Sequence, residues 1–135
     1  MLLFKPYHVF PIVCEGQAIR KTETRRSWSK ARAKAGSVHQ CKLNFYDLYF
    51  AKVEILDVYE QSLGEMTGAS AKREGGYTGE EYARLWEIIN KRPLNPLEEV
   101  FVVQMRCVES QVDPIALKSY ENMYRMHMDA LRGSM

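Results

Sequence analysis

Val100-Phe101-Val102-Val103-Gln104-Met105 is the stretch that decides the fold of this 135-residue chain. Three of these six residues are β-branched and only one is polar, which predicts a strand buried in the core. Residues 49–59 predict a second strand, because Ala51, Val53 and Ile55 alternate with other side chains. Shorter strands are expected at residues 2–4, 22–26 and 38–45, and the last of these would point Val38, Cys41 or Leu43, and Phe45 inward.

Helices are expected between and after these strands. Residues 8–14 have helical apolar spacing, with Gly16 where the helix would end. Thr67 is a candidate cap for a short helix over residues 67–74, which Gly75-Gly76 would end. Thr78 and Glu81 have the capping-box spacing, and Asp113-Pro114 marks the start of the last helix. The helix after Thr78 has an apolar stripe of Tyr82, Leu85, Trp86 and Ile89, and one face of the last helix carries Leu117, Tyr120, Tyr124, His127 and Leu131.

This order of elements indicates an α+β protein, a small mixed β-barrel flanked by helices, with a C-terminal helix. We expect a domain over residues 1–108 and a helical tail over residues 109–135. The tail would dock on the domain or form a homodimer, since its Met123, Met126 and Met128 suit an adaptable packing surface.

Composition excludes several classes of protein. Hydrophobic residues make up 46% and charged residues 27%, the balance of a globular domain. No apolar run approaches the roughly 18 residues of a membrane helix, and the apolar start before Pro6 is too short for a signal sequence, so we expect no membrane partner and a cytoplasmic location. The three cysteines, Cys14, Cys41 and Cys107, have no close pairing and should be reduced. Zinc-ligand spacing is missing, and no metal or cofactor is expected.

Charge is concentrated in residues 20–34. Seven of their side chains are basic and one is acidic, so this segment carries +6, whereas the whole chain carries +2 and the remainder therefore −4. Basic side chains neutralise phosphates, and an aromatic ring within the run can stack on a base. The candidate nucleic-acid contacts are Arg25, Arg26, Trp28, Lys30, Arg32 and Lys34. RNA is favoured over DNA because no helix-turn-helix or zinc-finger pattern is present. Alternatively, the run is a solvated loop, and Trp28 covers the core.

The motif Lys21-Thr22-x-Thr24-x-Arg26, followed by Ala71-Lys72-Arg73-Glu74-Gly75 and by Val100 to Val103, resembles the ASCH domain, a member of the PUA-like β-barrel superfold. The resemblance covers about residues 2–108. ASCH domains are proposed RNA-binding modules. Some small members are amidohydrolases that remove the acyl group from N4-acetylcytidine, and another member is reported as a ribonuclease.

Matched to the motif of the amidohydrolases, the implied catalytic residues are Lys21, Thr24 and Glu74. In a regular strand, Lys21 and Thr24 would point to opposite faces, so the site requires Lys21 to precede the strand. An oxyanion hole is expected from N–H groups near Gly75-Gly76. Alternatively, Thr24 is only a strand former, and Lys21 and Glu74 form a solvated ion pair.

Two functions therefore remain open. The first is binding of RNA or a nucleotide through a basic cleft, and the second is hydrolysis, either deacylation of an N4-acetylcytidine-type nucleoside or RNA cleavage. The longer link from Gly16 to Lys21 and the basic residues up to Lys34 favour a polymeric substrate or ligand over a free nucleoside.

Overall fold

The computed structural model describes residues 1–14 and 19–135, so the helix end expected at Gly16 lies outside the described residues. Five strands form one mixed sheet in the order β1-β3-β4-β5-β2. The strands are β1 (Leu2–Leu3), β2 (Glu23–Arg26), β3 (Val38–Lys42), β4 (Ala51–Ser62) and β5 (Glu99–Ser110). β1 pairs with β3 in parallel, whereas β3–β4, β4–β5 and β5–β2 are antiparallel.

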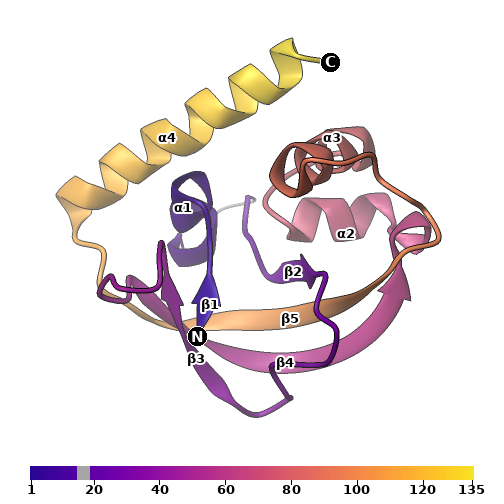
Figure 1. Cartoon of the computed structure of the whole chain (residues 1–135). Coiled ribbons are helices and arrows are strands. Elements are labelled where there is room, and N and C mark those ends of the chain that lie inside the picture. The colour runs from indigo at the N-terminus through magenta and orange to yellow at the C-terminus, as the bar shows by residue number, and fades with distance from the viewer. Residues whose placement is uncertain (15–18) are drawn as a thin grey trace.

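The sheet curls into a half-barrel, which Figure 1 shows as a bowl formed mainly by β4 and β5. These two strands are each 12 residues long, and their pairing shifts register between Lys52 and Val53 and again between Ile55 and Asp57. Such irregularities increase the local bend and twist of a strand pair. The sheet ends at β1 on one side and β2 on the other, so the half-barrel is open between these two strands.

Helices fill the concave side of the sheet (Figure 1). They are η1 (Pro6–His8), α1 (Val9–Val13), η2 (Leu63–Glu65), α2 (Gly68–Arg73), α3 (Gly79–Asn90) and α4 (Pro114–Gly133). One apolar cluster joins α1 to the sheet and includes Val9, Ile12 and Met105. A second joins the helices to one another and includes Phe10, Trp86 and Tyr124. These layers confirm the α+β class and the barrel-like sheet with a C-terminal helix.

Local capping fixes the ends of three helices, as the sequence predicts. The Thr67 hydroxyl accepts from the Ser70 amide at 3.1 Å, and the Asp113 carboxylate accepts from the Ala116 amide at 2.8 Å. At α3 both halves of the capping box are present, from the Thr78 amide to Glu81 at 2.8 Å and from the Glu81 amide to Thr78 at 3.2 Å. Each cap satisfies amides that the first helical turn leaves without a partner.

The tail helix α4 docks on the helices of its own domain. Tyr124, Met128 and Leu131 are each less than 5% exposed and belong to the inter-helical core. The apolar face predicted for this helix therefore packs within the chain. The homodimer expected as the alternative stays a prediction. None of the described helices is both long and apolar enough to cross a membrane.

The inward direction predicted for the side chains of Val38 and Phe45 is wrong. Val38 is 56% exposed and Phe45 is 62% exposed, whereas Cys41 is fully buried. The cause is strand alternation: Val38 pairs with Glu54 and Cys41 pairs with the buried Ala51, and residues three apart in a strand point to opposite faces. Val38 therefore lies on the face of β3 opposite to Cys41, and Phe45 lies after the end of β3. Ile89 of the predicted α3 stripe is also 39% exposed.

Candidate functional site

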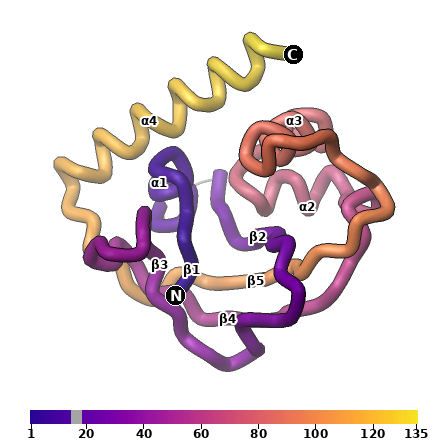
Figure 2. Tube along the Cα trace, in the orientation of Figure 1, coloured from indigo at the N-terminus to yellow at the C-terminus, as the bar shows by residue number. Residues whose placement is uncertain are grey.

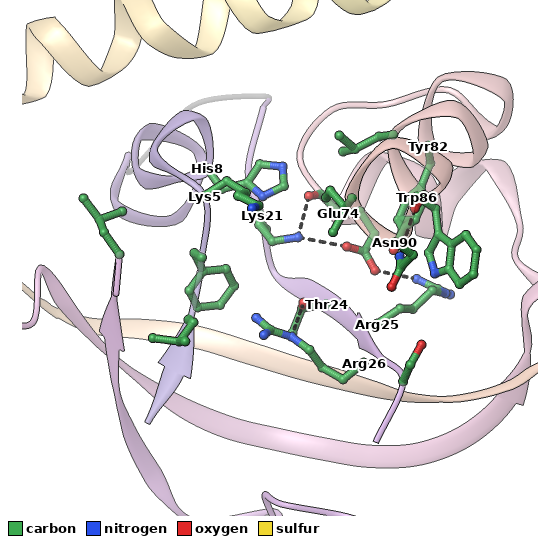
Figure 3. A pocket seen from close by; sticks show the side chains of 16 residues that line it. Lys5, His8, Lys21, Thr24, Arg25, Arg26, Glu74, Tyr82, Trp86 and Asn90 are labelled. Atoms are coloured by element: carbon green, nitrogen blue, oxygen red, sulfur yellow. Dashed lines mark hydrogen bonds and ion pairs between the residues drawn. The ribbon is translucent and has the colours of Figure 1, made fainter. Parts of the chain in front are cut away.

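A cavity of about 360 Å³ lies where the half-barrel is open, with residues of both outer strands in its wall. Leu3 of β1 lines one side, Thr24 and Arg26 of β2 line the other, and α3 contributes Tyr82 and Trp86. Figure 3 shows the polar side chains of the wall converging from these elements. The wall also contains an aromatic ring and three titratable side chains, which belong to Phe4, His8, Lys21 and Glu74.

Lys21 lies two residues before β2, where it forms an isolated antiparallel bridge with Glu74. The residue is 5% exposed. Its Nζ donates to the Glu23 carbonyl at 3.1 Å, to the Glu74 carbonyl at 2.8 Å and to Glu74 Oε1 at 2.8 Å. All three N–H donors of the ammonium are therefore engaged. Because regular pairing of β2 starts only at Glu23, Lys21 and Thr24 both line the same cavity, as the hypothesis from the sequence requires.

Glu74 also holds Arg25, in a buried network of opposite charges. Arg25 Nη1 donates to Glu74 Oε2 at 2.9 Å and to Glu23 Oε2 at 2.7 Å, and its Nη2 donates to Gln61 at 3.0 Å. Glu23 is fully buried and Glu74 is 2% exposed. Lys21, Arg25, Glu23 and Glu74 sum to zero charge, which is the condition under which buried ions are tolerated.

Electrostatics differ among the members of this network. Burial lowers the pKa of Lys21, and the neighbouring Glu74 carboxylate opposes that shift. Burial acts to raise the pKa of Glu23, but hydrogen bonds and charge from Arg25 outweigh it and lower that pKa. Both carboxylates therefore serve as counter-ions for cations in the wall of the cavity.

Thr24 contacts a different cation. Its hydroxyl oxygen accepts from Arg26 Nε at 3.0 Å, and the Arg26 guanidinium lies 4.8 Å from the centre of the Phe4 ring. Thr24 is 4% exposed. Within the described part of the chain, Thr24 is the hydrogen-bond partner of Arg26, so the Nη donors of this guanidinium are available to a ligand in the cavity.

The three residues implied as catalytic, Lys21, Thr24 and Glu74, thus line one cavity. The predicted nucleic-acid contacts differ in position: some are in the cavity wall and others are on the exposed connection after β2. Arg25 is paired inside the wall, and Arg26 faces the cavity. Trp28 is half-buried against Phe101, with ring centres 6.0 Å apart. Lys30, Arg32 and Lys34 are exposed on the connection from β2 to β3 and do not line the cavity.

That connection runs across β4 before it enters β3 (Figure 2). The Gly36 amide donates to the Ile55 carbonyl, and the Ile55 amide donates to the Ser37 carbonyl, both at 2.8 Å. Gly36 has φ +88°, the positive value expected for this turn. The exposed basic side chains lie on the segment that follows in sequence from Ser27, which lines the cavity.

The prediction that the Gly75 and Gly76 amides form an oxyanion hole is wrong. The Gly75 and Gly76 amides donate to the Lys72 carbonyl at 3.2 and 2.7 Å, which closes the end of α2. Both glycines have positive φ, 141° and 88°. Their turn instead carries the chain from Glu74 in the cavity wall to Tyr77 in the core.

Reasoning from the sequence missed His8, Tyr82 and Trp86 as lining residues of the cavity. Tyr82 and Trp86 belong to the apolar stripe predicted for α3, and both also line the cavity. His8 carried no motif at all. Among the described residues, no group of three or more His, Cys, Asp or Glu side chains is placed to hold a metal ion.

Comparison with known proteins relates the chain by fold alone. No family model matches the sequence, and no curated protein matches it. The fold is similar to the crystal structure of protein EF3133 from Enterococcus faecalis V583, described under the family model DUF984. The TM-score is 0.55 at 19% sequence identity, and the match covers 76% of this chain and 68% of that one.

Proposed function

We propose that this protein is an ASCH-like amidohydrolase that removes the acyl group from an N4-acetylcytidine-type nucleoside, free or at an accessible position in RNA. The supporting observation is that the Thr24 hydroxyl and the buried Lys21–Glu74 ion pair line the same cavity. Removing such charges from water costs several kcal/mol per ion before compensation. Charges buried in a cavity wall are characteristic of functional sites.

The size of the cavity favours a nucleoside over a stretch of polymer. Its volume of about 360 Å³ lies at the lower end of the range of roughly 300–1,000 Å³ for small-molecule sites. Phe4, Tyr82 and Trp86 give it aromatic walls, which suit a planar base. An RNA substrate would therefore insert one unstacked nucleotide, with the rest of the strand outside.

In the proposed reaction the Thr24 oxygen bonds to the acyl carbon, the proton of the Thr24 hydroxyl passes to N4 as the C–N4 bond breaks, and the acyl group is held as an ester until water hydrolyses it. The Arg26 Nε donor stabilises negative charge on the Thr24 oxygen. The Nη groups of Arg26 are candidates for the oxyanion donors that the Gly75-Gly76 turn does not supply. Lys21 adds a fixed positive charge to the same wall.

The test is turnover of N4-acetylcytidine by wild-type protein and by variants of the two threonines. Thr24→Val preserves the shape of the side chain and should abolish turnover, whereas Thr24→Ser should retain part of it. Thr22→Val is the matched control, because Thr22 bonds through its backbone to Arg73 of α2 and Met105 of β5 and does not line the cavity. Absence of turnover of any acylated nucleoside by the wild-type protein refutes the proposed function.

RNA binding through the exposed connection is the second candidate. Lys30, Arg32 and Lys34 are exposed, and none of them takes part in an ion pair with a described residue. Unpaired cations on a chain whose remainder is acidic attract a polyanion. This surface would hold the strand while the cavity takes one nucleotide.

A further inference from the structure

A second polar cluster connects the wall of the cavity to the C-terminal helix. The Tyr77 hydroxyl lies 2.7 Å from His8 Nε2 and 2.8 Å from His127 Nε2. Tyr77 is 1% exposed and His8 is 6% exposed. The Tyr7 ring stacks on His127 with ring centres 3.7 Å apart. These groups come from η1, from the turn after α2 and from α4, so the tertiary fold holds them together.

His8 is the member of this cluster that lines the cavity. In Figure 3 one nitrogen of its ring points toward Lys21 and the cavity, and the other points away. Nε2 is the nitrogen bound to Tyr77, which does not line the cavity. Nδ1 is therefore the nitrogen that a ligand or a water molecule in the cavity would meet.

The single hydroxyl hydrogen of Tyr77 determines where the imidazole hydrogens lie. When both histidines are neutral, Tyr77 donates to one ring and accepts from the other. If Tyr77 donates to His127, then His8 carries its hydrogen on Nε2 and keeps a lone pair on Nδ1. The Lys21 ammonium beside the ring favours this arrangement, because a cation attracts a lone pair and repels an N–H dipole.

Other candidates for a proton acceptor in the cavity are occupied. Lys21 Nζ uses all three hydrogens in bonds to Glu23 and Glu74 and has no lone pair while it is an ammonium. The Glu74 carboxylate is bound on one oxygen by Lys21 and on the other by Arg25. We propose that His8 is the general base of the hydrolysis, and that Tyr77 and His127 are positioning residues that fix its tautomer; this inference rests on the proposed function.

The proton balance of the step is as follows. A water molecule gives one proton to His8 Nδ1 while its oxygen bonds to the acyl carbon of the Thr24 ester. The tetrahedral adduct then breaks its bond to the Thr24 oxygen, and this oxygen recovers the proton from His8, directly or through one water. While His8 is an imidazolium, its Nε2–H donates to Tyr77, which donates to His127.

The surroundings keep His8 neutral, so that its Nδ1 has a lone pair at neutral pH. Burial lowers the pKa of His8 well below 6.5, and the positive charges nearby add to this shift. Burial lowers the pKa of His127 to about 4. The titratable and charged groups that face His8 are Tyr7, Lys21, Arg26, Tyr77 and His127.

The kinetic test compares variants that preserve shape. His8→Gln retains a polar group for Tyr77 but has no base at the Nδ1 position, and its kcat should fall by at least about 100-fold with KM little changed. Tyr77→Phe and His127→Leu should each lower kcat by about 10-fold or more through loss of the fixed tautomer. His127→Gln, which still accepts from Tyr77, should restore most of the activity. Tyr124→Phe is the control, since it removes a buried hydroxyl bonded to the Gly75 carbonyl at 2.7 Å and should leave kcat unchanged.

A second measurement needs no variant and no turnover. Nitrogen-15 NMR of the imidazole rings in wild-type protein should show His8 with its hydrogen on Nε2 and His127 with its hydrogen on Nδ1. The opposite tautomers overturn the inference, whether or not the protein is active. If the wild-type protein is active and His8→Gln has an unchanged kcat, the inference fails while the proposed function stands. An inactive wild-type protein rejects the proposed function itself.

Discussion

Glu74→Gln should be among the most destabilising conservative substitutions in this chain. The wild-type carboxylate accepts from Lys21 at 2.8 Å and from Arg25 at 2.9 Å, and the side chains of all three residues are at most 3% exposed. The amide has almost the same shape but lacks the charge, so two buried cations are left with Glu23 as their remaining counter-ion. Removing one partner of a buried ion pair typically costs about 3–5 kcal/mol. For a chain of this length, that corresponds to a melting temperature lower by roughly 10–20 °C.

The measurement is thermal and urea unfolding beside a matched control. Glu98→Gln also removes a carboxylate from an arginine, but its pair with Arg92 is partly exposed. Exposed pairs contribute about 0–1 kcal/mol, so this control should melt within about 5 °C of wild type. The explanation is refuted if Glu74→Gln melts as close to wild type as Glu98→Gln does.

A double variant separates the charge imbalance from the loss of contacts. Lys21→Met combined with Glu74→Leu removes one cation and one anion and leaves Arg25 paired with Glu23. Apolar replacement of a whole buried pair is often neutral or stabilising. We expect this variant to recover part of the stability that Glu74→Gln loses, because the Glu23 and Glu74 carbonyls still lose the Lys21 donor. A double variant that is no more stable than Glu74→Gln would show that the contacts, and not the charge balance, determine stability.

Three further outcomes are expected. Stability should fall as pH decreases from 6.5 toward 4, because the unfolded chain binds protons at His8 and His127 that the folded chain, in which both pKa values are lowered, does not; in urea unfolding, the loss between pH 7 and pH 5 should be smaller in His127→Gln than in wild type, by at most about 2 kcal/mol because solvent screens this partly exposed ring. If RNA binds along the β2–β3 connection, Lys30→Glu and Arg32→Glu should each reduce the slope of log affinity against log salt by about 0.7 or more, whereas Lys118→Glu on exposed α4 should not. Met128→Ala should lower stability by about 2–5 kcal/mol at any protein concentration, because Met128 is 4% exposed within its own chain. The control Met126→Ala, at a position 72% exposed, should change stability by less than about 0.5 kcal/mol. A melting temperature that depends strongly on protein concentration would favour the homodimer instead.

Elements that depend on neighbours in sequence could be predicted. Thr78 and Glu81 lie three residues apart, and their reciprocal hydrogen bonds form within one helical turn. The run from Val100 to Met105 is buried in β5 because few other positions accept so apolar a strand. The outward direction of Val38 was predictable, because Val38 and Cys41 are three residues apart and so lie on opposite faces of a regular strand.

The position of Arg25 differs from the exposed nucleic-acid contact that the sequence predicts. A basic run suggests a surface, yet this residue is 7% exposed and its guanidinium is held by Glu74, 49 residues away. One indication was present in the sequence, since Glu23 is the only acidic residue of the run and lies two residues from Arg25, on the same side of a strand. The contact between His8 and Tyr77 spans 69 residues and had no such indication.

The open edge of the sheet explains why an ion pair is buried at this place. The Met105 amide donates to the Thr22 carbonyl at 2.9 Å, which fixes the alternation of the β2–β5 ladder and turns the backbone of Glu23 away from β5. A further strand would normally satisfy that edge, but here the Lys21 ammonium bonds to the Glu23 carbonyl and, across the gap, to the Glu74 carbonyl. Lys21 therefore replaces ladder hydrogen bonds and closes β2 onto the end of α2. Lys21 therefore has this structural role in addition to the catalytic role proposed for it, and activity measured on a folded variant separates the two. The double variant of Lys21 and Glu74 provides the distinction: if it folds and still deacylates the nucleoside, the pair serves the sheet edge only, and if it folds without activity, the Lys21–Glu74 pair acts in the reaction.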